Sequence, residues 1–479
     1  MPKPTGPWSA WRVLLLGALL LAPASAWAAE QRNMRLVGMD DLQGRSAYQP
    51  VIHEQNGRWI AYVGHHGGKR LNPLTGQVEL NGTSIVDVTD PKRPRYLHHL
   101  PGAEGEAEAG GAAMVRVCDG KTLPHAARER TYLLRTLGNL AHEIWDVTDP
   151  ARPSRVTTVL DGLRSTHKNW WECDSGIAYL VSDGAPSGWR TNRMTKIYDL
   201  SDPARPRFIR DFGLVGQEPG STGVAPEGVH GPIAWKSRVY FAYGTGAKGV
   251  LQIVDRDKLL AGDPQAVDRF APTPDNLRYP QIGRLDMSPA WGGHTSFPVL
   301  GIPVPGWSPS VPGRTRDFVV LVSESLRNEC QEIRQLSFMV DVTTERTPYP
   351  VATFEVPDSA GDFCRRGGRF GPHSSNESFT PIYYGRLVFI AYFNAGVRAV
   401  DIRDPFHPVE AGFFVPDTTA RTDKRCVEVS GTPRCKIAIQ TNNVEVDGRG
   451  YIYLVDRADT GLHIVELTGP ARAIANFSR

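Results

Sequence analysis

The sequence predicts an all-β fold, a seven-bladed β-propeller of four-stranded antiparallel blades. Three observations support this prediction. A strand-and-turn motif recurs seven times, apolar stretches of strand length precede its copies, and helical periodicity is nearly absent. The 48 glycines and 38 prolines supply the turns that such a fold needs.

The motif is clearest in three copies that share an Asp-Pro corner, at residues 85–94 (IVDVTDPKRP), 144–153 (IWDVTDPARP) and 197–206 (IYDLSDPARP). Four fainter copies follow, at residues 253–257, 339–348, 400–408 and 464–470. The first acidic residues of successive copies are 59, 53, 56, 86, 60 and 65 positions apart, so one unit carries an insertion.

Each unit is expected to form four short strands. Alternating β-branched or aromatic residues lead into an Asp corner, where the carboxylate can cap the backbone and proline fixes φ. Another strand follows the corner, as at 207–212 in the third unit. Two apolar stretches precede the motif, and in the third unit the second of them is 177–182. Such units stack radially as propeller blades. Either 34–39 or 473–477 can close the last blade as its outer strand, and we favour the N-terminal segment.

These IVDVTDP-type units resemble the LVIVD repeats of bacterial exported propellers. The resemblance covers almost the whole chain after its N-terminal segment, through the seven copies named above. It implies the propeller fold and export, and it leaves the activity open, because one fold serves many functions.

The N-terminus is typical of a cleaved signal peptide. Lys3 and Arg12 precede the apolar run 13–22, and small residues follow up to Ala29. The apolar run would span only about 15 Å as a helix, half of a bilayer core. We therefore expect a signal peptide over 1–29 and a single propeller domain over 30–479, in the periplasm or secreted.

Composition argues against two classes of partner. The formal net charge is +3 without any basic run, so nucleic-acid binding has no electrostatic support. No second apolar stretch approaches the length of a membrane span. Oligomeric state cannot be read from the sequence.

Six cysteines in an exported chain permit three disulfides. Cys118 and Cys173 occupy matching places on the first strands of neighbouring blades. Cys330 and Cys364 fall in loops on one face, and Cys426 and Cys435 flank a short loop. We predict these three pairs, and three pairs of free buried thiols are the alternative.

Four consecutive blades offer a histidine where their first strand enters the central channel: His167, His230, His294 and His373. Neutral imidazoles that converge on one axis can bind iron or copper, whereas catalytic zinc more often keeps three protein ligands. Alternatively, each histidine satisfies local backbone groups. The arrangement is similar in architecture to carotenoid cleavage oxygenases and to methanethiol oxidases of the selenium-binding-protein type, but no sequence signature of either is present.

Other side chains are expected to complete this site. Carboxylates near the histidines can orient the second ring nitrogen, and the candidates are Glu172, Glu227, Glu377 and Glu445. Tryptophans of the same region can bind an apolar or aromatic small-molecule substrate, and the candidates are Trp170, Trp189 and Trp291. The glutamates can instead be solvated, and the tryptophans can instead fill gaps between blades.

Two functional hypotheses follow. The first is a redox metalloenzyme, an oxidase or oxygenase with a four-histidine iron or copper site at the channel mouth. The second is a non-catalytic propeller that binds a protein or a small ligand through its loop-rich face. No nucleophile elbow or phosphate-binding loop is present, so hydrolysis has no support in the sequence.

Overall fold

The computed structural model describes residues 1–2, 30–304 and 315–477. Residues 3–29, which hold nearly all of the expected signal peptide, lie outside the described residues. Within the described part of the chain, no helix is long and apolar enough to cross a membrane.

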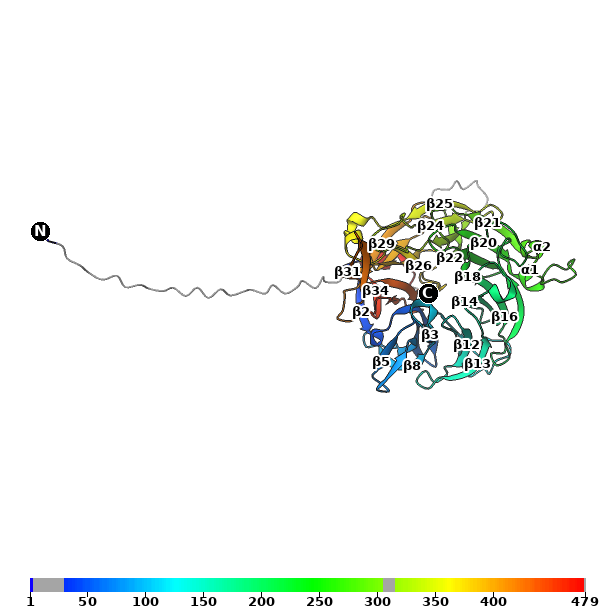
Figure 1. Cartoon of the computed structure of the whole chain (residues 1–479), viewed down its shortest axis with the longest axis horizontal. Coiled ribbons are helices and arrows are strands. Elements are labelled where there is room, and N and C mark those ends of the chain that lie inside the picture. Colours follow the sequence, from blue (N-terminus) through cyan, green and yellow to red (C-terminus); the bar gives the residue numbers. More distant parts are fainter. Residues whose placement is uncertain (3–29, 305–314, 478–479) are drawn as a thin grey trace.

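The fold is all-β, and antiparallel sheets of short strands radiate from a common centre (Figure 1). The first three sheets are β3 (Ala47–Gln55), β4 (Arg58–His66), β7 (Gly82–Asp87) and β8 (Arg95–Pro101); β10 (Val115–Asp119), β11 (Thr131–Leu137), β12 (Ala141–Asp146) and β13 (Ser154–Leu160); and β14 (Thr166–Trp171), β15 (Ile177–Ser182), β16 (Met194–Asp199) and β17 (Arg207–Phe212). The short strand β9 (Gly111–Ala112) also pairs with β4.

Two further sheets have the same order. They are β18 (Val229–Trp235), β19 (Arg238–Tyr243), β20 (Val250–Asp255) and β21 (Gln281–Asp286), and β22 (Thr295–Pro303), β23 (Thr315–Val322), β24 (Ser337–Asp341) and β25 (Tyr349–Phe354). The helices α1 (Arg256–Ala261) and α2 (Pro274–Arg278) lie between β20 and β21. They account for part of the insertion in the long repeat.

The C-terminal strands form one nine-stranded sheet that also includes the N-terminal strands β1 (Glu30–Arg32) and β2 (Met34–Asp40). Its other members are β26 (Phe370–Ser375), β27 (Leu387–Phe393), β28 (Val397–Asp401), β29 (Val409–Val415), β32 (Thr441–Val446), β33 (Ile452–Asp456) and β34 (Leu462–Leu467). A single residue pair, Phe393 with Thr441, joins its two halves.

The N-terminal strand closes the sheet of the last motif. Strand β2 pairs with β34, from Met34 opposite Leu467 to Asp40 opposite Leu462. This pairing confirms the favoured N-terminal closure, whereas the C-terminal segment forms the helix α3 (Gly469–Ile474).

The repeated motif has one local geometry throughout. Asp87, Asp146 and Asp199 each accept a hydrogen bond from the backbone N–H two residues later, as the Asp corner requires. The pairing of motif strand with outer strand shifts register at the same place in these units, for example between Ile144 and Trp145. Such bulges increase the local twist. The apolar residues of the motif strands pack in the core, where Ile85, Ile144 and Ile197 are fully buried.

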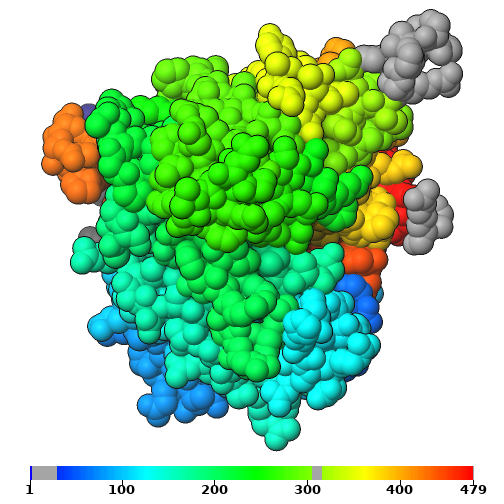
Figure 2. Space-filling model, turned by 90° about the vertical axis from the view of Figure 1, so that its right-hand side faces the viewer, coloured from blue at the N-terminus to red at the C-terminus, as the bar shows by residue number. Residues whose placement is uncertain are grey.

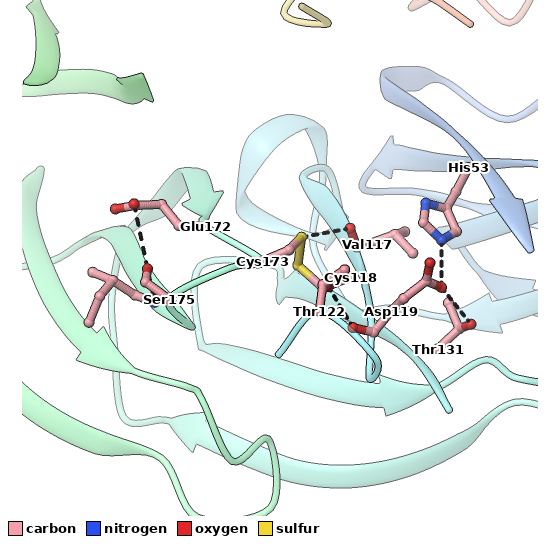
Figure 3. The surroundings of a disulfide bond; sticks show 10 residues. His53, Val117, Cys118, Asp119, Thr122, Thr131, Glu172, Cys173 and Ser175 are labelled. Atoms are coloured by element: carbon pink, nitrogen blue, oxygen red, sulfur yellow. Dashed lines mark hydrogen bonds and ion pairs between the residues drawn. A yellow bond between two sulfur atoms is a disulfide. The ribbon is translucent and has the colours of Figure 1, made fainter. Parts of the chain in front are cut away.

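All three predicted disulfides are confirmed: Cys118–Cys173, Cys330–Cys364 and Cys426–Cys435. The first joins β10 to the segment after β14 and so connects neighbouring sheets (Figure 3). The third joins β30 (Lys424–Val429) to β31 (Thr432–Ile437), a hairpin that projects from the molecule, in orange in Figure 2. Another hairpin consists of β5 (Lys69–Asn72) and β6 (Gln77–Leu80).

Candidate metal centre

The four predicted histidines lie together at the starts of four successive inner strands. His167, His230 and His373 belong to β14, β18 and β26, and His294 immediately precedes β22. At His167, His230 and His373 the register with the next strand shifts across the histidine. A bulge re-aims a side chain that regular pleating would direct otherwise. These irregularities therefore position imidazoles from different sheets around one point.

The imidazoles form a continuous arc. Ring centroids are 4.4 Å apart for His167 and His230, 3.4 Å for His230 and His294, and 4.4 Å for His294 and His373. The Nε2 atoms of His167 and His230 are 2.7 Å apart. Two nitrogens bound to one ion at about 2.05 Å and at right angles would be about 2.9 Å apart, so this spacing suits neighbouring ligands of a single metal.

The tautomer of His373 follows from its partners. Its Nδ1 lies 2.6 Å from the carbonyl oxygen of Asn442, which can only accept, so Nδ1 carries the proton. Its Nε2 is then an acceptor, and Arg457 Nη2 donates to it over 3.3 Å. A backbone carbonyl on the far nitrogen is the usual means of fixing a metal-binding imidazole. His294 has its Nδ1 3.1 Å from Thr295 Oγ1, a hydroxyl that can either donate or accept.

Tyr48 closes the arc between its two ends. The Tyr48 hydroxyl lies 3.2 Å from Nε2 of His167, and its ring centroid is 5.7 Å from those of both His167 and His373. Tyr48 is on β3, where the register also shifts. Tyr48 was not singled out from the sequence, because the first blade has no histidine at this position.

The carboxylates near the histidines differ from those expected. Glu324 has oxygens 3.7 Å from His294 Nε2 and 3.6 Å from His373 Nε2, and ligand atoms of these three residues lie within 4.8 Å of one another. Glu108 has an oxygen 3.8 Å from His167 Nδ1. Both come from segments outside the repeated motif, so no repeat pattern pointed to them.

The four predicted glutamates have other partners, so the expectation that they orient the imidazoles is corrected. Glu172 pairs with Arg256 and accepts from the Tyr179 hydroxyl. Glu227 lies 3.5 Å from Lys248. Glu377 follows the end of β26 and Glu445 lies near the end of β32, so both lie further along the channel than the histidines.

These two glutamates belong to a buried ion-pair layer with Arg116 and Lys168. Glu377 binds both Arg116 and Lys168. Glu445 accepts from the backbone N–H groups of Glu377 and Ser378, both at 3.1 Å. The Cβ of any other residue at Gly231 would collide with the Lys168 side chain, so the glycine leaves room for the lysine. Burial raises the pKa of Glu445 to about 7.

An aromatic layer fills the channel beyond the ion pairs. It consists of Trp170, Trp235, Phe297, Phe379 and Tyr384, with Trp235 stacked on Phe379 at 3.7 Å. These side chains lie on the same strands as the histidines, a few residues further along, or in the segment after β26. The channel is therefore packed on this side of the histidines.

A polar cavity of about 650 Å³ lies near the histidines, although none of the four lines it. Glu108 and Arg457, which contact His167 and His373, line it together with His66. Further lining residues come from the β5–β6 and β30–β31 hairpins, including Arg70 and Arg425. A ligand in this cavity would contact Glu108 and Arg457, the lining residues that reach His167 and His373.

The three predicted tryptophans lie elsewhere, which corrects their expected role at this cavity. Trp170 is in the aromatic layer, with the Arg116 guanidinium 4.8 Å from its ring. Trp189 is buried in an apolar cluster with Phe212 and Leu214. Trp291 donates its indole N–H to the carbonyl of Arg334. These residues fill gaps in and between sheets, the alternative that the sequence left open.

Burial controls the electrostatics of the histidines. It lowers the pKa of all four well below 6.5, and neighbouring cations lower it further. All four rings are therefore neutral, the form that binds a metal. Burial would raise the pKa of Glu108, but the nearby cations, among them Arg193 and Arg457, hold it below the usual value.

Comparison with known proteins adds no assignment. Neither a scan against protein-family models nor a search of curated proteins gave a match to this chain.

Proposed function

We propose that this chain is an exported seven-bladed β-propeller whose channel holds a redox metal on His167, His230, His294 and His373. The observation that carries the proposal is the direct contact of four neutral imidazoles from four neighbouring sheets. Glu324 is an additional ligand on the side of His294 and His373.

The seven blades follow from dividing the nine-stranded sheet at its single pair between Phe393 and Thr441. Strands β26 to β29 then form one blade, and β32, β33, β34 and β2 form another. With the five other sheets this division gives seven four-stranded units, in keeping with the seven motif copies and an LVIVD-type propeller. Three disulfides support an oxidising compartment such as the periplasm.

Iron or copper suits this ligand set better than zinc. Four imidazoles supply only neutral nitrogen ligands, which both redox metals accept, whereas catalytic zinc usually keeps three protein ligands and a water. Bound iron or copper would supply oxidase or oxygenase chemistry. The ion-pair and aromatic layers exclude solvent from one side, so reactants would approach the metal from the side of the cavity.

Metal analysis of purified protein tests the proposal. After incubation with iron(II), copper(II) or zinc(II) and removal of excess metal, we expect about one equivalent of iron or copper. Reduction by dithionite and reoxidation by air, followed by electron paramagnetic resonance, should then show a one-electron change. Less than about a tenth of an equivalent of every metal after reconstitution would overturn it.

A second candidate is a propeller that binds a partner protein through the face with the hairpins. Leu71, Leu74 and Val78 on the β5–β6 hairpin are all more than half exposed, and exposed apolar groups are typical of interaction sites. A protein that binds no metal would favour this function.

A further inference from the structure

We propose that the polar cavity above the histidines binds a small organic oxyanion, a carboxylate or a phosphate ester, through Arg369, Arg425 and Arg457. The identification of this anion as the substrate of the metal centre rests on the proposed function. The arginine site itself stands on its own geometry.

The three arginines come from different segments and meet at one wall of the cavity. Arg425 on β30 donates through Nη2 to the carbonyl oxygen of Arg457 over 2.9 Å. Arg369 donates through Nη1 to Glu324 Oε1 over 2.9 Å, and Arg457 Nη1 lies 3.9 Å from the same oxygen. Both Arg369 and Arg457 also lie 5.3 Å from the Phe393 ring, so one aromatic residue supports two guanidinium groups.

The three guanidinium groups of this wall outnumber the carboxylates that contact them, although four arginines and four carboxylates line the cavity as a whole. Glu324 pairs with Arg369, and Asp423 lies 3.2 Å from Arg425, so two carboxylates face three guanidinium groups. The other cations near the cavity have their own partners, since Arg70 pairs with Asp459 and Arg193 pairs with Glu108. Burial first and then the three arginines lower the pKa of the adjacent His66 to about 3, against the opposing effect of Glu108.

Arginine is suited to oxyanions because its planar fork presents paired N–H donors to carboxylate or phosphate oxygens. Each guanidinium has five N–H donors, and the contacts above engage only some of them. The cavity, about 650 Å³, has the size of a typical small-molecule site. Its lining is polar, with Asn81, Asn328 and Gln440, so the body of the ligand should be polar as well.

Arg457 connects this wall to the metal centre. Its Nη2 lies 3.3 Å from Nε2 of His373, the nitrogen that faces the other imidazoles. An anion held by Arg457 would therefore lie next to the metal. Because the channel on the other side of the histidines is packed, the anion would approach through the cavity. The oxyanion replaces the apolar or aromatic substrate that the tryptophans suggested.

Titration calorimetry with small probes of similar size tests the charge preference. We expect succinate and glycerol 3-phosphate to bind at least ten-fold more tightly than the neutral succinamide, with affinity that falls as salt is added. The diamine 1,4-diaminobutane should bind weakly, although Glu106 also lines the cavity. The two anions show whether carboxylate or phosphate is preferred.

Arg425→Gln is the main variant, because Arg425 lies on an exposed hairpin away from the core. It should weaken anion binding at least ten-fold and leave the metal content unchanged. Arg152→Gln, in an exposed turn where Arg152 pairs with Asp149, is the matched control and should bind as the unmodified protein does. Arg369→Lys, which keeps the charge beside Glu324 but loses the planar fork, should weaken binding as well.

The outcomes separate this proposal from that of the metal centre when both metal-loaded and chelator-treated protein are titrated. Anion binding that depends on Arg425 in both forms supports the arginine site, even if no metal is retained. Equal affinity for succinate and succinamide, tighter binding of the diamine, or no anion binding up to about 10 mM would overturn it. Anion binding that requires metal and is unchanged in Arg425→Gln would also overturn it, because the anion would then be a metal ligand only.

Discussion

His167 and His230 approach each other to 2.7 Å between their Nε2 atoms, although they lie 63 residues apart in the sequence. Each belongs to a different sheet, and a register shift at each histidine directs the ring toward its neighbour. This pair is therefore the most direct test of a shared metal.

Replacing any one of the four histidines by alanine should remove or loosen the metal and leave the fold largely intact. Loss of one ligand from a shared ion should lower metal affinity by at least ten-fold to a hundred-fold, the range measured for groups that merely support ligands. Metal content and circular dichroism measure the two effects separately. His407→Ala, an exposed histidine in a turn, is the control and should keep the metal.

The opposite pattern is expected for Ile144→Ala. Ile144 is fully buried on a motif strand, so its truncation should cost about 2 to 4 kcal/mol of unfolding free energy with normal metal content. If the histidine variants instead resembled Ile144→Ala, with lower stability and unchanged metal, the imidazoles would be structural.

The ion-pair layer predicts a strong energetic coupling between Lys168 and Glu377. Glu377→Ala leaves Lys168 and Arg116 as buried cations without their shared carboxylate, and such a loss typically costs about 3 to 5 kcal/mol. Lys168→Met should cost less, because Arg116 still pairs with Glu377. Urea unfolding of the two single variants and the double variant gives the coupling, and additive effects would show that the pair contributes little.

The sequence predicted the parts of this molecule that repeat. The motif copies located the sheets and their Asp corners. The position shared by the first strands located His167, His230, His294 and His373. Glu108 and Glu324 were missed because each occurs in a loop of one unit only, with no second copy for comparison. The arginines of the cavity wall were missed for the same reason.

The tryptophans and glutamates show a different limit. Trp170 lies three residues after His167 on the same inner strand, and at about 3.3 Å per residue this separation places it roughly 10 Å further along the channel. Glu377, two residues beyond the end of β26, is likewise displaced from His373. A residue a few positions away from a histidine in the sequence therefore lies in a neighbouring layer of the channel. Multiplying the number of intervening residues by the rise per residue would have separated these layers.

The disulfides predict unequal losses of stability. Cys118–Cys173 closes a loop with a sequence separation of 55, whereas Cys426–Cys435 spans only 9. Loop-closure entropy then predicts about 4 kcal/mol for the first and about 2.5 kcal/mol for the second. Paired Cys→Ser variants compared by urea unfolding measure these values. If removal of Cys426–Cys435 lowered the unfolding free energy more than removal of Cys118–Cys173, loop-closure entropy of the unfolded chain would not explain the stabilisation by the hairpin disulfide.

Stability should fall between pH 6.5 and pH 4, and His463 on β34 is one of the buried histidines that cause this fall. Burial lowers its pKa to about 4, whereas an unfolded histidine titrates near pH 6.5. Between these values the unfolded chain binds a proton that the folded protein does not, so acid favours unfolding, by up to about 3 kcal/mol for this residue. His463→Leu removes the titration and should flatten the dependence of unfolding free energy on pH relative to the unmodified protein.

Leu454→Ala, at the buried position opposite His463 on β33, should lower stability equally at every pH. Urea unfolding at pH 7, 6, 5 and 4 measures all three proteins, and parallel curves for His463→Leu and the unmodified protein would show that His463 does not control the acid sensitivity.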